Sequence, residues 1–282
     1  MKNISIKNKG ENNKLIDNKL SILITQDGLS YSLYSVLENR YNTLVAKTFS
    51  QKDNYIEEIK KILTEEELTN KDFKQVNIVV SGNRTTIIPN VLFSKNEYEK
   101  IYYLNFGVPE NQNIYYSQMP KSANTLIYSA DKALINMLDN IFLKYSLYSH
   151  AEPFVESNFT KNKISENRDK TKVFIQVFEN FTDILVFKNE KILLYNTFKY
   201  KTNNDLLYHI INVFEQLKLS PEETEVSLSG FIETDDLVVI HLRKFVRIVY
   251  FESLNTEFKY FYKFQEIQPH YFINFLNIIK CE

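Results

Sequence analysis

The predicted elements of this chain occur in the same order twice, and this repetition constrains the fold more than any single motif. Alternating apolar and polar residues predict strands, and apolar residues at helical spacing predict the helices between them. The strands lie at 19–25, 29–33, 44–49 and 76–82 in the first copy and at 173–178, 181–187, 192–200 and 226–230 in the second. Asn39 precedes Asn189 by 150 residues, and Gly82 precedes Gly230 by 148. The sequence therefore predicts two copies of a strand-strand-strand-helix-strand unit.

A helix follows the third strand of each copy. In the first copy Tyr55, Ile59 and Ile62 form one apolar face. In the second copy Thr202 and Asp205 predict a capping box, in which two side chains bond to backbone N–H groups at the start of a helix. Strands mixed with helices in this order predict an α/β protein with mixed sheets.

The length of 282 residues allows two domains, and a hydrophobic fraction of 44% is enough to form their cores. We expect residues 1–18, which are rich in Lys and Asn, to be a disordered tail. The repeat predicts a first domain at 19–149 and a second domain at 150–282.

Three further segments complete the predicted organisation. Apolar residues at helical spacing predict a helix at 131–148 that ends the first domain. The polar segment 157–170 lacks periodicity and is predicted to be a loop. A last helix after Pro269 is a candidate to pack back on the first domain.

Glycine is scarce, since the chain contains only five. No two of them are close enough to share a loop, which excludes the P-loop, the dinucleotide-binding G-x-G-x-x-G and the nucleophile elbow G-x-S-x-G. A formal net charge of −1 gives no global attraction for nucleic acid or anionic lipid. Composition therefore disfavours the commonest nucleotide-dependent and polyanion-binding classes.

Targeting signals are not evident in the sequence. Residues 1–18 lack the apolar segment of a signal peptide, and no run of about 18 apolar residues predicts a transmembrane helix. The single cysteine, Cys281, has no partner for an internal disulfide. We expect a cytoplasmic protein.

The duplicated unit resembles the actin, sugar-kinase and Hsp70 superfamily, in which two such domains face each other across a nucleotide cleft. The whole chain after residue 18 is similar to a bacterial family of unknown function, DUF3822, found mainly in Bacteroidetes. The stretch from Tyr200 to Phe251 and the ending from Pro269 to Glu282 carry this likeness best. The resemblance implies an actin-like ATPase fold of the ribonuclease H-like type. The chain also looks like the assembly-platform proteins of type IV pili and type II secretion.

The resemblance implies three nucleotide-binding loops, and the first would be the turn between the first two strands. Active members carry Asp, Gly and Ser or Thr there. This chain has Asp27, Gly28 and Ser30. The turn is too short to wrap a phosphate, and Asp-Gly hairpins are common for structural reasons. We favour a purely structural turn.

The second loop, at 176–183, contains no glycine, whereas active relatives have Asp-x-Gly-Gly-Gly-Thr. Non-glycine residues at positive φ cost about 1–2 kcal/mol each, so a cradle of backbone N–H groups is unfavourable. Glu179 would also repel a phosphate. Asp183 is the candidate Mg²⁺ ligand, but we favour an exposed strand residue.

The third loop keeps one glycine, Gly230, and has Phe231 where active relatives carry a second. An aromatic ring here can stack on a base or fill an empty cleft, and we favour the second interpretation. Three weakened loops argue against ordinary ATP hydrolysis.

Other constellations give weaker signals. The four histidines, His150, His209, His241 and His270, lack metal-ligand spacing and are interpreted as surface or packed residues. Tyrosine clusters beside basic residues such as Lys199 and Arg243 permit RNA binding, but Tyr and Phe favour strands in any case.

The sequence thus favours a non-catalytic actin-like scaffold that binds an unidentified protein partner, with no cofactor. The first alternative is an ATP-binding switch or weak ATPase that uses ATP with Mg²⁺ at Asp27, Gly28, Ser30, Asp183 and Gly230. The second alternative is an RNA-associated accessory protein. Enzyme activity and oligomeric state stay open, with the balance against an enzyme.

Overall fold

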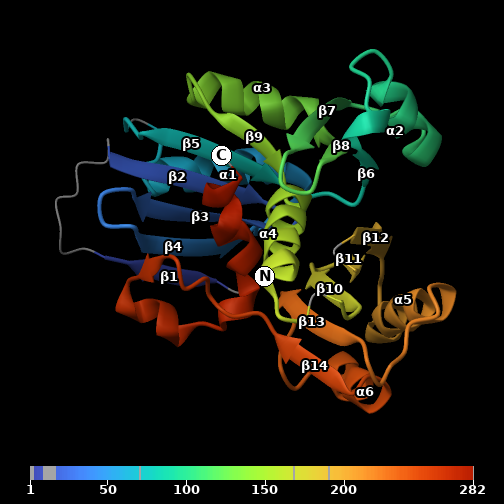
Figure 1. The fold of residues 1–282 in the computed structure, drawn as a ribbon. Coiled ribbons are helices and arrows are strands. Elements are labelled where there is room, and N and C mark those ends of the chain that lie inside the picture. The colour runs from blue at the N-terminus through green and yellow to red at the C-terminus, as the bar shows by residue number, and fades with distance from the viewer. Residues whose placement is uncertain (1–2, 9–16, 70, 168, 190, 282) are drawn as a thin grey trace.

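Two sheets with equivalent strand order form the framework of the molecule (Figure 1). The computed structural model describes residues 3–8, 17–69, 71–167, 169–189 and 191–281. We call the parts built on the larger and smaller sheets the first and second lobes. The larger sheet has the order β1-β4-β3-β2-β5-β9, with β15 beside β4, and the smaller has the order β12-β11-β10-β13-β14.

The strands of the first lobe are β1 (Ile4–Lys7), β2 (Asn18–Ile24), β3 (Gly28–Ser35), β4 (Arg40–Thr48), β5 (Gln75–Val80), β9 (Ser146–Ser149) and β15 (Lys259–Tyr260). Those of the second lobe are β10 (Lys172–Val177), β11 (Phe181–Lys188), β12 (Lys191–Lys199), β13 (Glu225–Gly230) and β14 (Ile248–Phe251). The helices packed on these sheets are α1 (Tyr55–Glu65), α3 (Lys132–Ile141), α5 (Asn203–Gln216) and α6 (Leu237–Phe245).

The predicted duplication is confirmed strand by strand. In the first lobe β2, β3 and β4 are antiparallel neighbours and β5 is parallel to β2. In the second lobe β10, β11 and β12 are antiparallel neighbours and β13 is parallel to β10. The equivalence also extends beyond the predicted unit. In each lobe a further helix leads to a further parallel strand, α3 to β9 in the first and α6 to β14 in the second.

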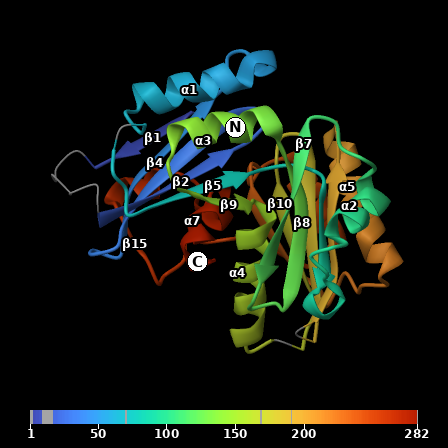
Figure 2. The same cartoon turned by 90° about the horizontal axis from the view of Figure 1, so that it is seen from above.

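The helices begin and pack as their sequences indicate. Thr202 and Asp205 form the predicted capping box at the start of α5. Ile59 and Ile62 of α1 are buried against the first sheet. Figure 2 shows α1 and α3 together over one side of that sheet. Among the described residues, no helix is both long and apolar enough to cross a membrane.

An insert separates β5 from α3 in the first lobe. It consists of β6 (Thr85–Pro89), α2 (Tyr98–Phe106), β7 (Gln112–Met119) and β8 (Asn124–Asp131). Its strands form a small antiparallel sheet in the order β6-β8-β7. The second lobe has no counterpart of this sheet among its described residues, so the insert distinguishes the two copies.

Helix α4 (Ala151–Ile164) lies between the lobes, and it corrects the prediction of a loop at 157–170. The prediction was wrong because α4 has no single apolar face. Its Phe154 joins the first hydrophobic core, whereas its Glu156 and Asn162 are buried polar residues. A helix enclosed on several sides does not need the apolar stripe of a surface helix.

The predicted helix at 131–148 is shorter in the structure. Helix α3 ends at Ile141, and Ser146–Ser149 instead form β9, an edge strand parallel to β5. Pairing of its backbone with β5 outweighs the helical spacing of the apolar residues. The predicted last helix is replaced by short turns, with α7 (Ile273–Leu276) between two 3₁₀ segments.

The predicted disordered tail is wrong for the part of it that the structure describes. Ile4–Lys7 form β1, which pairs antiparallel with β4 and buries Ile6. Asn18 already belongs to β2. Residues 1–2 and 9–16 lie outside the described part of the chain.

Candidate functional site

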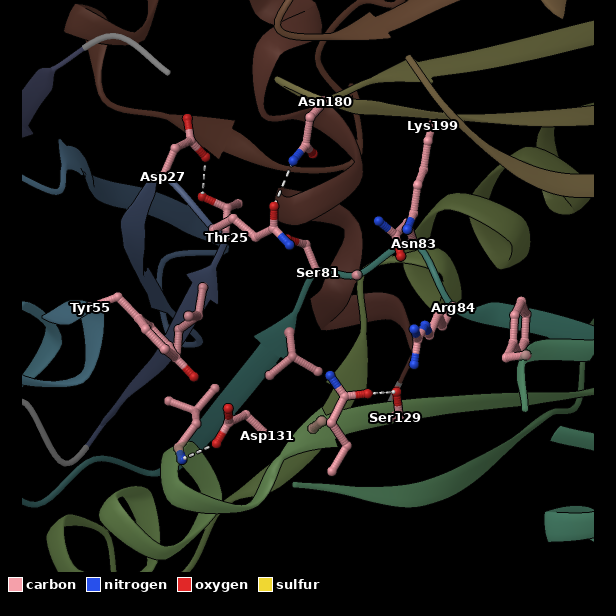
Figure 3. A pocket seen from close by; sticks show the side chains of 18 of the residues that line it. Thr25, Asp27, Tyr55, Ser81, Asn83, Arg84, Ser129, Asp131, Asn180 and Lys199 are labelled. Carbon is pink, nitrogen blue, oxygen red and sulfur yellow. Dashed lines mark hydrogen bonds between the residues drawn. The ribbon is translucent and has the colours of Figure 1, made fainter. Parts of the chain in front are cut away.

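A cavity of about 840 Å³ lies where the first lobe, the insert and the second lobe meet (Figure 3). The ends of β2 and β5 and the residues that follow them, at 24–27 and 80–84, form one wall. Tyr55 of α1 and Leu134 of α3 contribute from the first lobe, and Asn180 and Lys199 from the second. Loops that leave the carboxyl ends of parallel strands commonly form binding sites in α/β proteins.

The first predicted loop is a tight turn whose polar atoms bond to one another. The backbone N–H of Thr25 donates to the Gly28 carbonyl at 2.9 Å, and the Thr25 hydroxyl donates to Oδ1 of Asp27 at 2.7 Å. Burial opposes ionisation of Asp27, but hydrogen bonding, including that from Thr25, holds the pKa of its carboxyl below the usual value.

These contacts separate the three candidate residues of that loop. Asp27 lines the cavity, whereas Gly28 begins β3 and is not in the lining. Ser30 lies inside β3 with no exposed surface. The turn therefore brings one of the three candidates to the cavity.

Asp183 is fully buried, which corrects the expectation of an exposed strand residue. β11 is covered along nearly its whole length, and α4 packs against it. Oδ2 of Asp183 lies 2.7 Å from Nε2 of His150, and its Oδ1 accepts the Thr197 hydroxyl at 2.5 Å. Tyr195 donates to the same Oδ1 at 3.3 Å. Asp183 is therefore held by side chains and does not line the cavity.

Gly230 ends β13 in a conformation that glycine favours, with φ of +85°. A Cβ atom here would lie 2.1 Å from the Val177 carbonyl oxygen, so the end of β10 approaches too closely for any side chain. The next residue, Phe231, donates its N–H to the same carbonyl at 2.8 Å. Gly230 therefore permits close contact of two strands, and it does not line the cavity.

Aromatic rings fill the space beside the second and third loops. Phe178 stacks on Phe181 with centroids 4.5 Å apart and contacts Phe231 edge-on at 6.3 Å. Phe231 also contacts Phe272 of the C-terminal segment at 5.7 Å. His150 meets Phe178 edge-on at 5.0 Å. This cluster unites β10, β13, the start of α4 and the C-terminal segment.

Asp131 and Tyr55 meet on the side of the cavity formed by the helices. Asp131 caps α3 by accepting N–H groups of Ala133 at 2.7 Å and Leu134 at 3.2 Å. Burial, together with the nearby Asp131 carboxylate, raises the pKa of the Tyr55 hydroxyl, which therefore stays protonated.

Several lining residues had no functional assignment at the sequence level. Ser81, Asn83 and Arg84 follow β5 directly. Lys199, which ends β12, had been considered only for RNA binding. Their position after strand ends was the available signal, because such residues gather at one edge of a sheet. Within the described part of the chain, no group of three His, Cys, Asp or Glu side chains is arranged to hold a metal ion.

The overall fold has close counterparts among solved structures. A Bacteroides thetaiotaomicron protein with an actin-like ATPase fold and unknown function has a TM-score of 0.82 and 24% identity, covering 95% of this chain and 98% of that chain. A structure of the PilM-PilN type IV pilus biogenesis complex has a TM-score of 0.59 and 12% identity, covering 94% and 98%. The actin-like fold predicted from the repeat is thereby confirmed.

Comparison of the sequence with protein families shows to which family the chain belongs. A search of curated proteins finds no match to this chain. The model of the protein family of unknown function DUF3822 matches residues 7–249, which is most of the chain. The match includes residues 200–249, the part of the chain that had carried most of the likeness, whereas the ending from Pro269 lies beyond the matched residues. The chain therefore belongs to the DUF3822 family.

Proposed function

We propose that this protein is a non-catalytic actin-like scaffold that binds another protein. The main support is that the loops corresponding to nucleotide-binding loops in active relatives are occupied by their own side chains. Asp183 is bound by His150 and Thr197, and Phe231 packs between Phe178 and Phe272.

The buried pair of His150 and Asp183 would have to break before Asp183 could bind a magnesium ion. Its Nε2 and Oδ2 atoms are 2.7 Å apart, and the two side chains are 2% and 0% exposed. Leaving a buried hydrogen-bonding group without its partner costs about 1–3 kcal/mol. The donor set around Asp183 thus fits an internal imidazole better than Mg-ATP.

A nucleotide base would have to displace an aromatic side chain at the third loop. Phe231 contacts rings on two sides, and Phe178 and Phe272 are buried. Exposing a packed Phe side chain costs about 1.5–3 kcal/mol. This cost adds to the cost of forming a cradle of backbone N–H groups in the second loop, which contains no glycine.

The C-terminal segment connects the lobes and supports a rigid scaffold. The Tyr41 hydroxyl of β4 donates to the Leu276 carbonyl. Nδ2 of Asn274 donates to Oγ of Ser229 at the end of β13, at 2.9 Å. Neighbouring residues of one segment therefore hold both lobes, which opposes the opening that nucleotide exchange would require.

Protein binding is the activity that such a rigid body can retain without nucleotide chemistry. One of the structures that share this fold is a complex of two proteins, PilM and PilN. The likeness supports a protein partner here and does not identify it.

Calorimetric titration with MgATP tests the proposal. We expect no binding heat at millimolar nucleotide and no phosphate release. Binding in the low micromolar range together with turnover would overturn the proposed function. Cooperative thermal unfolding of the same sample is the control for folded protein.

An ATP-binding switch is the second candidate, because the cavity is of suitable size. Its volume of about 840 Å³ lies in the range of roughly 300–1,000 Å³ typical of small-molecule sites. Gly82 lines this cavity, and an added Cβ would meet nothing within 4 Å. If nucleotide binds there, Gly82→Phe should abolish binding and Gly82→Ala should preserve it.

A further inference from the structure

The cavity carries two cationic side chains whose charges are not paired within the described part of the chain. Arg84 leads into the insert of the first lobe, and Lys199 ends β12 of the second lobe. Neither side chain forms an ion pair or hydrogen bond with another described residue. Both are exposed, and Figure 3 shows them reaching from different lobes toward the same side of the cavity.

The carboxylates of the cavity are better satisfied than these cations. Asp27 accepts a hydrogen bond from Thr25, and Asp131 accepts two from the backbone of α3. Glu179 also has an interaction partner. Glu110 and Glu179 are exposed carboxylates of the lining, and a bound anion must stay clear of both. Arg84 and Lys199 are therefore the charged groups of the cavity that an anionic ligand would pair.

The insert adds apolar surface beside these two cations. Phe106 and Val108 line the cavity, and Val108 is 75% exposed. Leu104, near the end of α2, is 86% exposed. Exposed apolar residues beside a cleft are typical of a surface that binds a protein segment.

We propose that this cleft binds an extended acidic segment of a partner protein. A carboxylate of that segment lies between Arg84 and Lys199, and a neighbouring apolar side chain packs on Phe106 and Val108. This inference rests on the proposed protein-binding function and adds the chemistry that selects the partner. A protein segment fits better than a phosphate chain, because it uses both the charged and the apolar walls.

Selection from a phage-displayed library of random peptides tests the chemistry directly. Peptides selected on the wild-type protein should be enriched in Asp or Glu next to a large apolar residue. A synthetic peptide of the selected sequence should lose at least about tenfold in affinity for the double variant Arg84→Glu, Lys199→Glu, since like charges facing each other across an interface are strongly unfavourable. The affinity of the peptide should also fall as salt concentration rises.

Two control proteins locate the binding site. Lys144 and Lys188 are exposed cations outside the cavity lining, so Lys144→Glu, Lys188→Glu makes the same change of charge elsewhere and should leave the affinity unchanged. Gly82→Phe should block the peptide, and Gly82→Ala should not.

The outcomes separate this inference from the proposed function. Failure to select peptides, or selection without acidic enrichment, overturns the acidic-segment proposal. If non-acidic peptides are selected and Gly82→Phe blocks them, protein binding survives while its proposed chemistry fails. If MgATP or inorganic phosphate displaces the peptide at low micromolar concentration, the cleft is a phosphate site and both proposals fail.

Discussion

Gly82 and Gly230 follow or end equivalent strands, yet a side chain would meet different surroundings at the two positions. At Gly230 the φ of +85° and the approach of Val177 to 2.1 Å from a Cβ position leave no room for one. At Gly82 an added Cβ meets nothing within 4 Å. The sequence-level interpretation of Gly230 as part of a nucleotide loop therefore competes with a packing requirement visible only in three dimensions.

Gly230→Ala should destabilise the protein by more than about 2 kcal/mol, because it combines an unfavourable φ with a backbone clash. Gly82→Ala is the matched control and should change the free energy of unfolding by no more than about 1 kcal/mol. Urea denaturation of both variants measures the difference. Equal stability of the two variants would show that the contact at Val177 does not constrain Gly230.

Helix α4 places two carboxylates one turn apart in a buried position. Glu156 accepts backbone N–H groups of Lys121 at 3.1 Å and Ser122 at 3.0 Å, in the turn between β7 and β8. Glu152 is 3% exposed, and its Oε2 has no hydrogen-bond partner. Burial, with a further contribution from the charge of Glu156, raises the pKa of Glu152 from 4.5 to about 7. The helix thus contacts the insert through Glu156, and it favours the protonated form of Glu152 below about pH 7.

The raised pKa of Glu152 predicts how stability depends on pH. The folded state binds this proton more tightly than the unfolded state, so Glu152 is most favourable below pH 4.5 and becomes less so as the pH rises toward 7. The loss amounts to about 3 kcal/mol and levels off above the folded pKa. Glu152→Gln should remove this part of the pH dependence in urea unfolding at several pH values. Glu215→Gln, an exposed change on α5, should keep it, and identical profiles for Glu152→Gln and the wild type would contradict the assignment.

The elements differ in how much of them the sequence could predict. The helix after Thr202 was predictable because a capping box and an apolar stripe are local signals. Helix α4 was not, because its buried residues include Glu152, Glu156 and Asn162, which normally mark a surface. The same limit applies to the site, where Asp27 was identified but the pairing of His150 with Asp183 depends on contact between lobes.

The whole molecule depends on a core that joins the two ends of the chain. Ile6 of β1 and Leu44 of β4 pack in one cluster with Phe264, Phe272 and other residues of the C-terminal segment. The same segment reaches the second lobe, where Nε2 of His270 lies 2.8 Å from the Ile232 carbonyl oxygen. The lobes are therefore coupled through this segment as well as through α4.

This coupling predicts one cooperative unfolding transition for both lobes. Phe272 is 1% exposed, so Phe272→Ala should lower the stability by about 3–5 kcal/mol and shift the whole transition in a calorimetric scan. Tyr208→Ala, at an exposed position of α5, should leave the transition nearly unchanged. Two transitions, only one of which moves in Phe272→Ala, would contradict the coupling.

The C-terminal residues of that core also determine when the first lobe can complete its folding during synthesis. Leu23, Leu44 and Val79 of the first sheet are covered by residues such as Phe275 and Ile278, which are translated more than 190 residues later. Until Phe275 and Ile278 have been translated, these apolar residues of the first sheet lack the side chains that cover them in the folded protein. The nascent first lobe should therefore require chaperone protection or a delay in folding until these covering residues have been synthesised.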